Sequence, residues 1–186
     1  MPKFNLKGVL LYMRLLLKPL LFIAVVITLL SVSFKGAAQQ TQTYPRITGY
    51  FSLTNPIGTW NKDGFKSNFD GDVYTIAFPF GMNLLKSDHF GVSFEVSPSI
   101  RTEKNVSKVN SVLFHPGAMF RFKHGFTFIG RMAFETNGRF GVTPVFNQVV
   151  VRGKNANFFV SVPVPVRFGN DQPASVGTGL QLGVSF

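Results

Sequence analysis

The feature that most constrains the fold of this chain is a two-residue alternation of apolar with small or polar residues, which recurs after Gln39. In the C-terminal segment one set of alternate positions is Val176, Thr178, Leu180, Leu182, Val184 and Phe186. The positions between them are Ser175, Gly177, Gly179, Gln181, Gly183 and Ser185. Successive side chains of a β-strand point to opposite faces, so this period predicts strands with one apolar face.

The same period recurs along the chain and predicts eight antiparallel strands in up-and-down order. They cover residues 46–53, 73–84, 90–101, 109–122, 126–136, 140–152, 158–168 and 175–186. The connections are rich in Gly, Asn, Asp, Ser and Lys, as hairpin turns are, and cover residues 55–70, 85–89, 102–108, 123–125, 137–139, 153–156 and 169–174. Alternation fails at residues 147–151, where we expect a β-bulge.

The N-terminal residues 1–38 have the pattern of a cleaved signal peptide, so the mature domain is expected to span residues 39–186. Basic residues precede an apolar stretch at 20–32, and the small residues Gly36, Ala37 and Ala38 follow it. The apolar stretch is shorter than the roughly 20 residues that a membrane-spanning helix needs. An uncleaved anchor that begins at Leu15 is the alternative, and Met13 is an alternative start.

Charge and cysteine content narrow the classes of function. The formal net charge is +11, but part of it belongs to the signal peptide, and the remaining basic residues are scattered. We therefore expect no nucleic-acid partner. The chain has no Cys, so lipid attachment through cysteine is excluded and no disulfide stabilises the exported domain.

The composition of the polar face indicates which face of the strands lines the barrel interior and which contacts lipid. In the strands 90–101 and 175–186 this face carries mainly Gly and Ser, with Glu95 and Arg101 as its charged residues. Small residues suit the interior of an eight-stranded barrel, and the apolar face suits contact with lipid acyl chains. Five phenylalanines near one rim resemble an aromatic girdle at the periplasmic side: Phe90, Phe122, Phe126, Phe158 and Phe186. With these phenylalanines at the periplasmic side, the connection 55–70, which contains Trp60, is expected to lie outside the cell.

The last residues carry a family resemblance. The run Thr-Gly-Leu-Gln-Leu-Gly-Val-Ser-Phe at 178–186 resembles the assembly signal of bacterial outer-membrane β-barrels, with Leu180, Leu182, Val184 and Phe186 as its residues. Together with the signal peptide and eight strands, the chain is similar to the small OmpA- and OmpX-like barrels of the porin type. The resemblance implies location in the outer membrane of a Gram-negative cell envelope and insertion by the barrel-assembly machinery.

Prolines within the predicted strands depart from that pattern. They are Pro79, Pro98, Pro116, Pro144, Pro163 and Pro165. A closed barrel has no free edge where a missing N–H is harmless, so we expect bulges, short strands or positions beyond the hydrocarbon core. A soluble sandwich, which tolerates prolines more easily, is the alternative fold.

Ionisable residues on the inward face form the candidate site, a structural polar network in the lumen. They are Glu95, Arg101, His115, Arg121, Arg131 and Glu135. A hairpin through 102–108 places Glu95 near His115 across the strand pair. A general base or polar gate is the functional alternative, and a lipid hydrolase with Ser111 as nucleophile is a further one. The sequence shows no metal-ligand spacing or phosphate-binding glycine pattern, so we expect no metal and no cofactor.

We therefore expect a non-enzymatic outer-membrane β-barrel with an envelope-structural or surface-interaction role. The alternatives are a narrow pore or lipid-handling channel, and a soluble exported lipid-binding β-barrel. Expected partners are the outer-membrane lipids and the barrel-assembly machinery. Basic residues on the predicted outer loops could also meet lipopolysaccharide phosphates, namely Lys62, Lys66, Lys104, Lys108 and Arg139.

Overall fold

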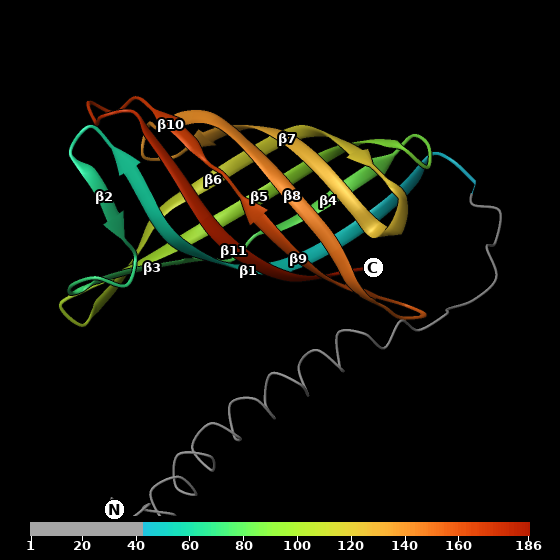
Figure 1. The fold of residues 1–186 in the computed structure, drawn as a ribbon, viewed down its shortest axis with the longest axis horizontal. Coiled ribbons are helices and arrows are strands. Elements are labelled where there is room, and N and C mark those ends of the chain that lie inside the picture. Colours follow the sequence, from blue (N-terminus) through green and yellow to red (C-terminus); the bar gives the residue numbers. More distant parts are fainter. Residues whose placement is uncertain (1–42) are drawn as a thin grey trace, which may run out of the picture. The chain divides into compact units, whose positions relative to one another are not determined.

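Residues 43–186, the part of the chain that the computed structural model describes, form one antiparallel β-sheet that closes on itself (Figure 1). The predicted signal peptide, residues 1–38, lies outside this part. The strands are β1 (Arg46–Asn61), β2 (Gly64–Ser67), β3 (Val73–Ala77), β4 (Phe80–Leu85), β5 (Phe90–Glu103), β6 (Val106–Arg121), β7 (Phe126–Glu135), β8 (Phe140–Arg152), β9 (Asn157–Pro163), β10 (Val166–Phe168) and β11 (Ser175–Ser185). A short 3-10 turn, η1 (Lys123–Gly125), joins β6 to β7. Residues 43–186 contain no helix that is long and apolar enough to cross a membrane.

The closed ring has eight strand positions, although the sheet has eleven strands. The path runs from β1 through β3 and β4 together, then β5, β6, β7 and β8, then β9 and β10 together, and returns through β11 to β1. The predicted strand 73–84 is interrupted at Phe78–Pro79, and the predicted strand 158–168 at Val164–Pro165. The all-β antiparallel class is thus confirmed, and the strand count is corrected by these two breaks and by β2.

The prolines explain the breaks. Pro79 and Pro165 lie between strand segments, and Pro163 ends β9. Pro98 and Pro144 remain inside β5 and β8, but each lies beside a break in the neighbouring strand. The carbonyl of Pro98 accepts a hydrogen bond from Phe78 N at 2.9 Å, and that of Pro144 accepts one from Val164 N at 2.9 Å. The missing N–H of each proline therefore lies opposite a point where the hydrogen-bond ladder between the strands is already interrupted.

Register shifts bend the strands at three places. One lies between Val149 and Val151, which confirms the bulge expected at 147–151. A second follows Pro98, between Ser99 and Ile100, and a third lies in β1 between Pro56 and Gly58. Each inserts an unpaired residue on one strand and increases the local twist that a closing sheet requires.

Two predicted connections are shorter in the structure because the strands continue further. The region 55–70 is largely a hairpin, in which the end of β1 pairs with β2. The predicted connection 102–108 is reduced to a tight turn at Lys104 and Asn105, whose φ angles are 46° and 64°. Two residues with positive φ match a hairpin turn that keeps the twist of the flanking strands, so pairing extends to Glu103 and Val106.

The two faces of the sheet have opposite chemistry. Residues with small or polar side chains outnumber apolar ones among the buried residues, and many large apolar side chains are exposed on the outer face. In β11 the buried positions include Ser175 and Gln181, whereas Leu180, Leu182 and Val184 are about 40% exposed. The interior apolar cluster is small and consists of Leu85, Met119, Ile129 and Val145. The alternation expected from the sequence is present, with the polar face inside the ring.

Candidate functional site

A polar network centred on Glu95 crosses the interior of the ring. Glu95 Oε2 accepts hydrogen bonds from Tyr50 Oη at 2.7 Å and from Arg131 Nη1 at 2.8 Å. Its other oxygen, Oε1, lies 2.9 Å from His115 Nδ1. The side chains of Glu95, His115 and Arg131 are only 3–4% exposed. The cross-strand contact expected between Glu95 and His115 is therefore present, and Arg131 joins it from β7.

A second group extends the network across β8 and β10. His115 Nε2 lies 2.8 Å from Thr143 Oγ1, which also accepts a hydrogen bond from Arg167 Nη1 at 2.9 Å. Arg167 Nε donates to Glu135 Oε1 at 2.7 Å. Side chains from β1, β5, β6, β7, β8 and β10 are thus connected through the interior. Both carboxylates of the network, the buried Glu95 and the largely buried Glu135, have a guanidinium partner, as charges in a protein interior require.

Glycines on neighbouring inward positions make room for this network. A Cβ atom on Gly81 would lie 2.5 Å from Tyr50 Oη, and one on Gly117 would lie 2.8 Å from Arg131 Cγ. Real side chains do not approach so closely, so the large residues Tyr50 and Arg131 need the absence of a side chain beside them. The mixture of glycine with a few large polar residues on one face is therefore a packing solution for a narrow interior.

Two predicted network residues lie elsewhere. Arg101 pairs with Glu103 on its own strand at 3.2 Å, and their side chains are 40% and 46% exposed. This pair is near the end of the ring, where water competes with it, so it contributes little to stability. Arg121 lies at the opposite end and lines a cavity. Glu135 belongs to the network, but through Arg167 rather than through Glu95.

Tyr50, Thr143 and Arg167 are network residues that the sequence prediction missed. Their phase in the alternation was a signal for all three. Tyr50 shares its phase with Thr48 and Ser52, and Arg167 shares its phase with Ser161. Tyr50 is easily assigned to the apolar face because of its aromatic ring, and the phase of Arg167 is hard to follow because Pro163 and Pro165 precede it. In the structure, the hydroxyl of Tyr50 and the guanidinium of Arg167 both bond to polar groups inside the ring.

The arrangement needed for a serine hydrolase is not assembled among these residues. Ser111 Oγ lies 3.1 Å from Ser99 Oγ, and both ring nitrogens of His115 face other partners. Four residues along a strand span about 13 Å, which is too far for Ser111 to share a proton with His115. Residues 43–186 contain no group of three or more His, Asp or Glu side chains placed to hold a metal ion.

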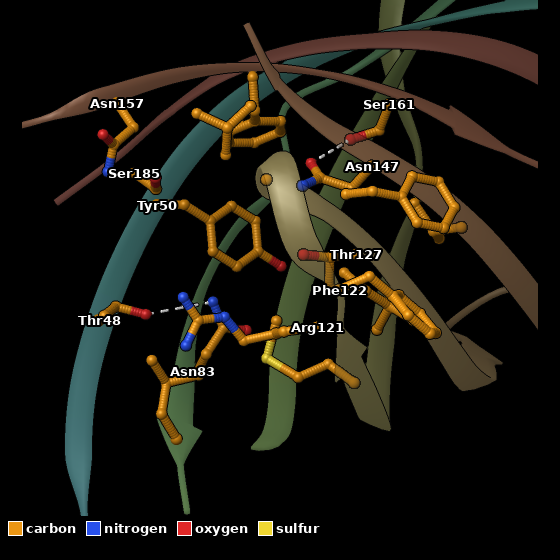
Figure 2. A pocket seen from close by; sticks show the side chains of 18 of the residues that line it. Thr48, Tyr50, Asn83, Arg121, Phe122, Thr127, Asn147, Asn157, Ser161 and Ser185 are labelled. Carbon is orange, nitrogen blue, oxygen red and sulfur yellow. Dashed lines mark hydrogen bonds between the residues drawn. The ribbon is translucent and has the colours of Figure 1, made fainter. Parts of the chain in front are cut away.

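A cavity of about 630 Å³ lies inside the end of the ring that carries the start of β1 and the end of β11 (Figure 2). Leu85, Met119, Ile129 and Val145 line it with apolar side chains, and Tyr50 and Arg131 of the network also line it. Arg121 points into this space from β6. The cavity is thus bounded by the network on one side and by the rim on the other.

The residues of the predicted assembly signal lie on the outer face of the last strand. Leu180, Leu182 and Val184 are about 40% exposed, and Phe186 is 66% exposed. Phe186 closes the ring with two backbone hydrogen bonds of 2.9 Å to Gly49, one in each direction. The Phe186 ring lies over Gly49, where a Cβ would approach it to 2.6 Å. The C-terminal residue is therefore part of the seam that closes the sheet.

Comparison with known proteins gives structural similarity alone. No protein-family model and no curated protein sequence matches the chain. Among solved structures, it is similar to a protein described as "De novo design of transmembrane beta-barrels", with a TM-score of 0.44, 9% identity, and coverage of 78% of this chain and 98% of the other. It is also similar to the solution NMR structure of the de novo designed TMB2.3, with a TM-score of 0.44, 15% identity, and coverage of 78% and 97%.

Proposed function

We propose that the protein is a small, non-enzymatic β-barrel of the bacterial outer membrane with a structural or surface-interaction role in the envelope. The apolar outer face of the closed ring carries this proposal. Side chains such as Phe94, Met82 and Phe134 are about half exposed, while the interior positions between them are polar and buried. A water-soluble protein rarely exposes so large an apolar surface, whereas a lipid-facing one requires it.

Aromatic pairs near both ends of the ring support the same assignment. At the end with the termini, Phe90 lies against Phe120 and Phe122 against Phe126, each with ring centroids 5.6 Å apart. At the opposite end, Trp60 lies 4.6 Å from Phe65, and Phe140 lies 6.1 Å from Phe168. The sequence suggested the first group and missed the second. Aromatic residues at two levels are typical of the two interfaces of a membrane.

The same proposal includes a signal peptide, a Gram-negative host, a likeness to the OmpA and OmpX barrels, and insertion by the barrel-assembly machinery. The C-terminal alternation that ends on Phe186 supports the last of these. Exposed Lys62, Lys66, Lys104 and Lys108 lie at the end far from the termini and are candidate contacts for lipopolysaccharide phosphates. Arg139 is excluded from this set, because its guanidinium is bonded to Gln172, Pro173 and Ser175.

Neither a conducting pore nor a soluble lipid-binding barrel is favoured by a specific observation. A narrow pore needs a continuous aqueous path, and the paired side chains around Glu95 and Arg167 obstruct it. A soluble lipid-binding barrel would bury its apolar face around the ligand, but here that face is on the outside. The lumen therefore fits a closed structural barrel better than a channel.

Spin labels at two adjacent positions test the proposal directly, since the chain has no native cysteine. We expect a label at Phe94→Cys in native outer membranes to be relaxed by oxygen, which dissolves in lipid, and to be shielded from a water-soluble nickel complex. A label at the buried neighbour Ser93→Cys should be shielded from oxygen. A preference for the nickel complex at residue 94 would contradict the membrane assignment. Outer-membrane fractionation and a heat-modifiability gel provide the control for folding.

The assembly role of the C-terminus makes a separate prediction. Phe186→Ala retains both backbone hydrogen bonds to Gly49 but removes the ring that covers it. We expect this variant to reach the periplasm normally and to accumulate there, with several-fold less protein in the heat-modifiable, inserted form. The matched control is Phe168→Ala, another exposed phenylalanine outside the terminal run. Equal insertion of all three proteins would contradict an assembly signal at Phe186.

A further inference from the structure

The cavity inside the ring has one apolar wall, which strand register makes continuous. Met119 lies opposite Ile129, and Ile129 lies opposite Val145. Gly91 pairs with both Leu85 and Met119, and its missing side chain lets these two residues meet. These residues are almost fully buried, at 2–7% exposure. They form an apolar surface inside a lumen whose other buried residues are mainly polar.

The mouth of the same cavity is cationic. Arg46, Arg121, Lys123 and Arg152 line it, and Asp88 is the acidic residue in the lining. Asp88 already accepts a hydrogen bond from the hydroxyl of Tyr44. None of these four basic residues takes part in an ion pair with a described residue. The mouth therefore has excess positive charge that would attract an anion.

Three residues that line the cavity each have a buried polar atom with no hydrogen-bond partner among residues 43–186. Arg121 Nη1 and Arg131 Nε are donors without an acceptor, and Asn83 Oδ1 is an acceptor without a donor. Asn83 is 9% exposed, and its amide nitrogen donates a 3.4 Å hydrogen bond to Thr48 Oγ1. Figure 2 shows the side chains of Arg121 and Asn83 in the lining of this space. Buried polar groups are nearly always satisfied, so these atoms mark a position for polar groups of a ligand or of water.

We propose that this cavity binds an amphiphile with a single acyl chain and an anionic head group, a carboxylate or a phosphate. The acyl chain lies against Leu85, Met119, Ile129 and Val145, and the head group accepts hydrogen bonds from Arg121. A volume of about 630 Å³ lies within the range of small-molecule sites. This inference goes beyond the proposed structural role and does not depend on the membrane assignment, because the cavity is interior to the ring.

Methionine methyl groups provide a test with internal references. Met119 lines the cavity and is 7% exposed, whereas Met82 and Met132 lie on the outer face and are each 56% exposed. We would label the full chain with 13C-methyl methionine, reconstitute it in phosphatidylcholine nanodiscs, and assign the signals by Met→Leu substitutions. Octanoate and octyl phosphate are the probes, because their short chains keep them soluble. Both should shift the Met119 signal saturably, and shifts confined to Met82 and Met132 would overturn the proposal.

Three further probes separate the parts of the ligand. Acetate and inorganic phosphate carry the anion without the chain, and octyltrimethylammonium carries the chain with the opposite charge. All three should leave the Met119 signal in place. An equal effect of inorganic phosphate and octyl phosphate would overturn the acyl site. An equal effect of the cationic probe would overturn the role of the basic mouth.

Arg121→Gln should weaken octanoate binding about tenfold, since it removes a charged hydrogen-bond donor. Lys108→Gln, which removes the same charge from the other end of the ring, should bind octanoate as the wild type does. Equal binding by both variants would overturn the role of Arg121. If Arg121→Gln does not fold, the probe series on the wild type still decides. Broadening of the Met82 and Met132 signals by spin-labelled lipid tests the membrane assignment separately, so failure of either proposal is distinguishable.

Discussion

Replacing Glu95 with leucine is expected to lower the free energy of unfolding by about 3–5 kcal/mol. The substitution removes the carboxylate that accepts hydrogen bonds from Tyr50 and Arg131 and faces His115. The Arg131 guanidinium then remains buried without a counter-charge, and desolvation of an unpaired charge is costly. Denaturant unfolding of the reconstituted protein in phospholipid vesicles, followed by circular dichroism, measures the change.

The matched variant removes both charges. In Glu95→Leu with Arg131→Met, no unpaired charge is left, so we expect most of the lost stability to return. Tyr50 and His115 still lose a partner, which keeps the recovery incomplete. If the double variant is no more stable than Glu95→Leu, the unpaired charge of Arg131 is not the cause of the lost stability. The loss then comes from altered packing or from the missing hydrogen bonds of Tyr50 and His115.

Replacing Phe94 with arginine is expected to destabilise the inserted protein by about 2–4 kcal/mol. Phe94 lies within β5, four residues from the start of the strand at Phe90, opposite Met82 on one side and Pro116 on the other, and it is 50% exposed. On a protein surrounded by water, an exposed side chain like this one tolerates substitution within about 0.5 kcal/mol. A large cost at an exposed position is therefore the signature of lipid contact. Unfolding titrations in vesicles measure it.

Val106→Arg is the control for this prediction. Val106 is 66% exposed, but it lies at the tip of the hairpin between β5 and β6, at the end of the ring. An arginine near the interface costs only about 0–1 kcal/mol. A similar small cost at both positions would indicate that water surrounds the whole outer face, and the soluble alternative would then replace the membrane assignment.

The local features of the fold could be predicted from the sequence to a large extent. The alternation of Leu180, Leu182 and Val184 with Gly and Gln places each side chain on its face without any knowledge of the partner strand. The turn residues and the loss of phase at 147–151 likewise indicate where strands end or bulge. The breaks at Pro79 and Pro165 were expected as irregularities, but their positions opposite Pro98 and Pro144 were not.

Only part of the candidate site could be predicted from the sequence. Glu95 and His115 lie on neighbouring strands joined by one hairpin, so their pairing follows from the register of that hairpin. The inward phase of Arg167 and Thr143 was visible in the local pattern, but nothing in that pattern says which strands face each other across the lumen, so their contacts could not be predicted. The cavity was missed for the same reason, since its apolar wall is assembled from β4, β6, β7 and β8.

What the sequence by itself determined is therefore the period of the backbone and the chemistry of each face. Both are properties of a few consecutive residues, because the side chains of a strand alternate wherever that strand is placed. The tertiary structure alone decided which inward residues meet. Arg131 reaches Tyr50 across 81 positions of sequence, and Gln181 reaches Ser52 across 129. Such contacts depend on how the ring closes, on the stagger between its first and last strands and on the breaks at the prolines, and these are set by the pairing of all strands together.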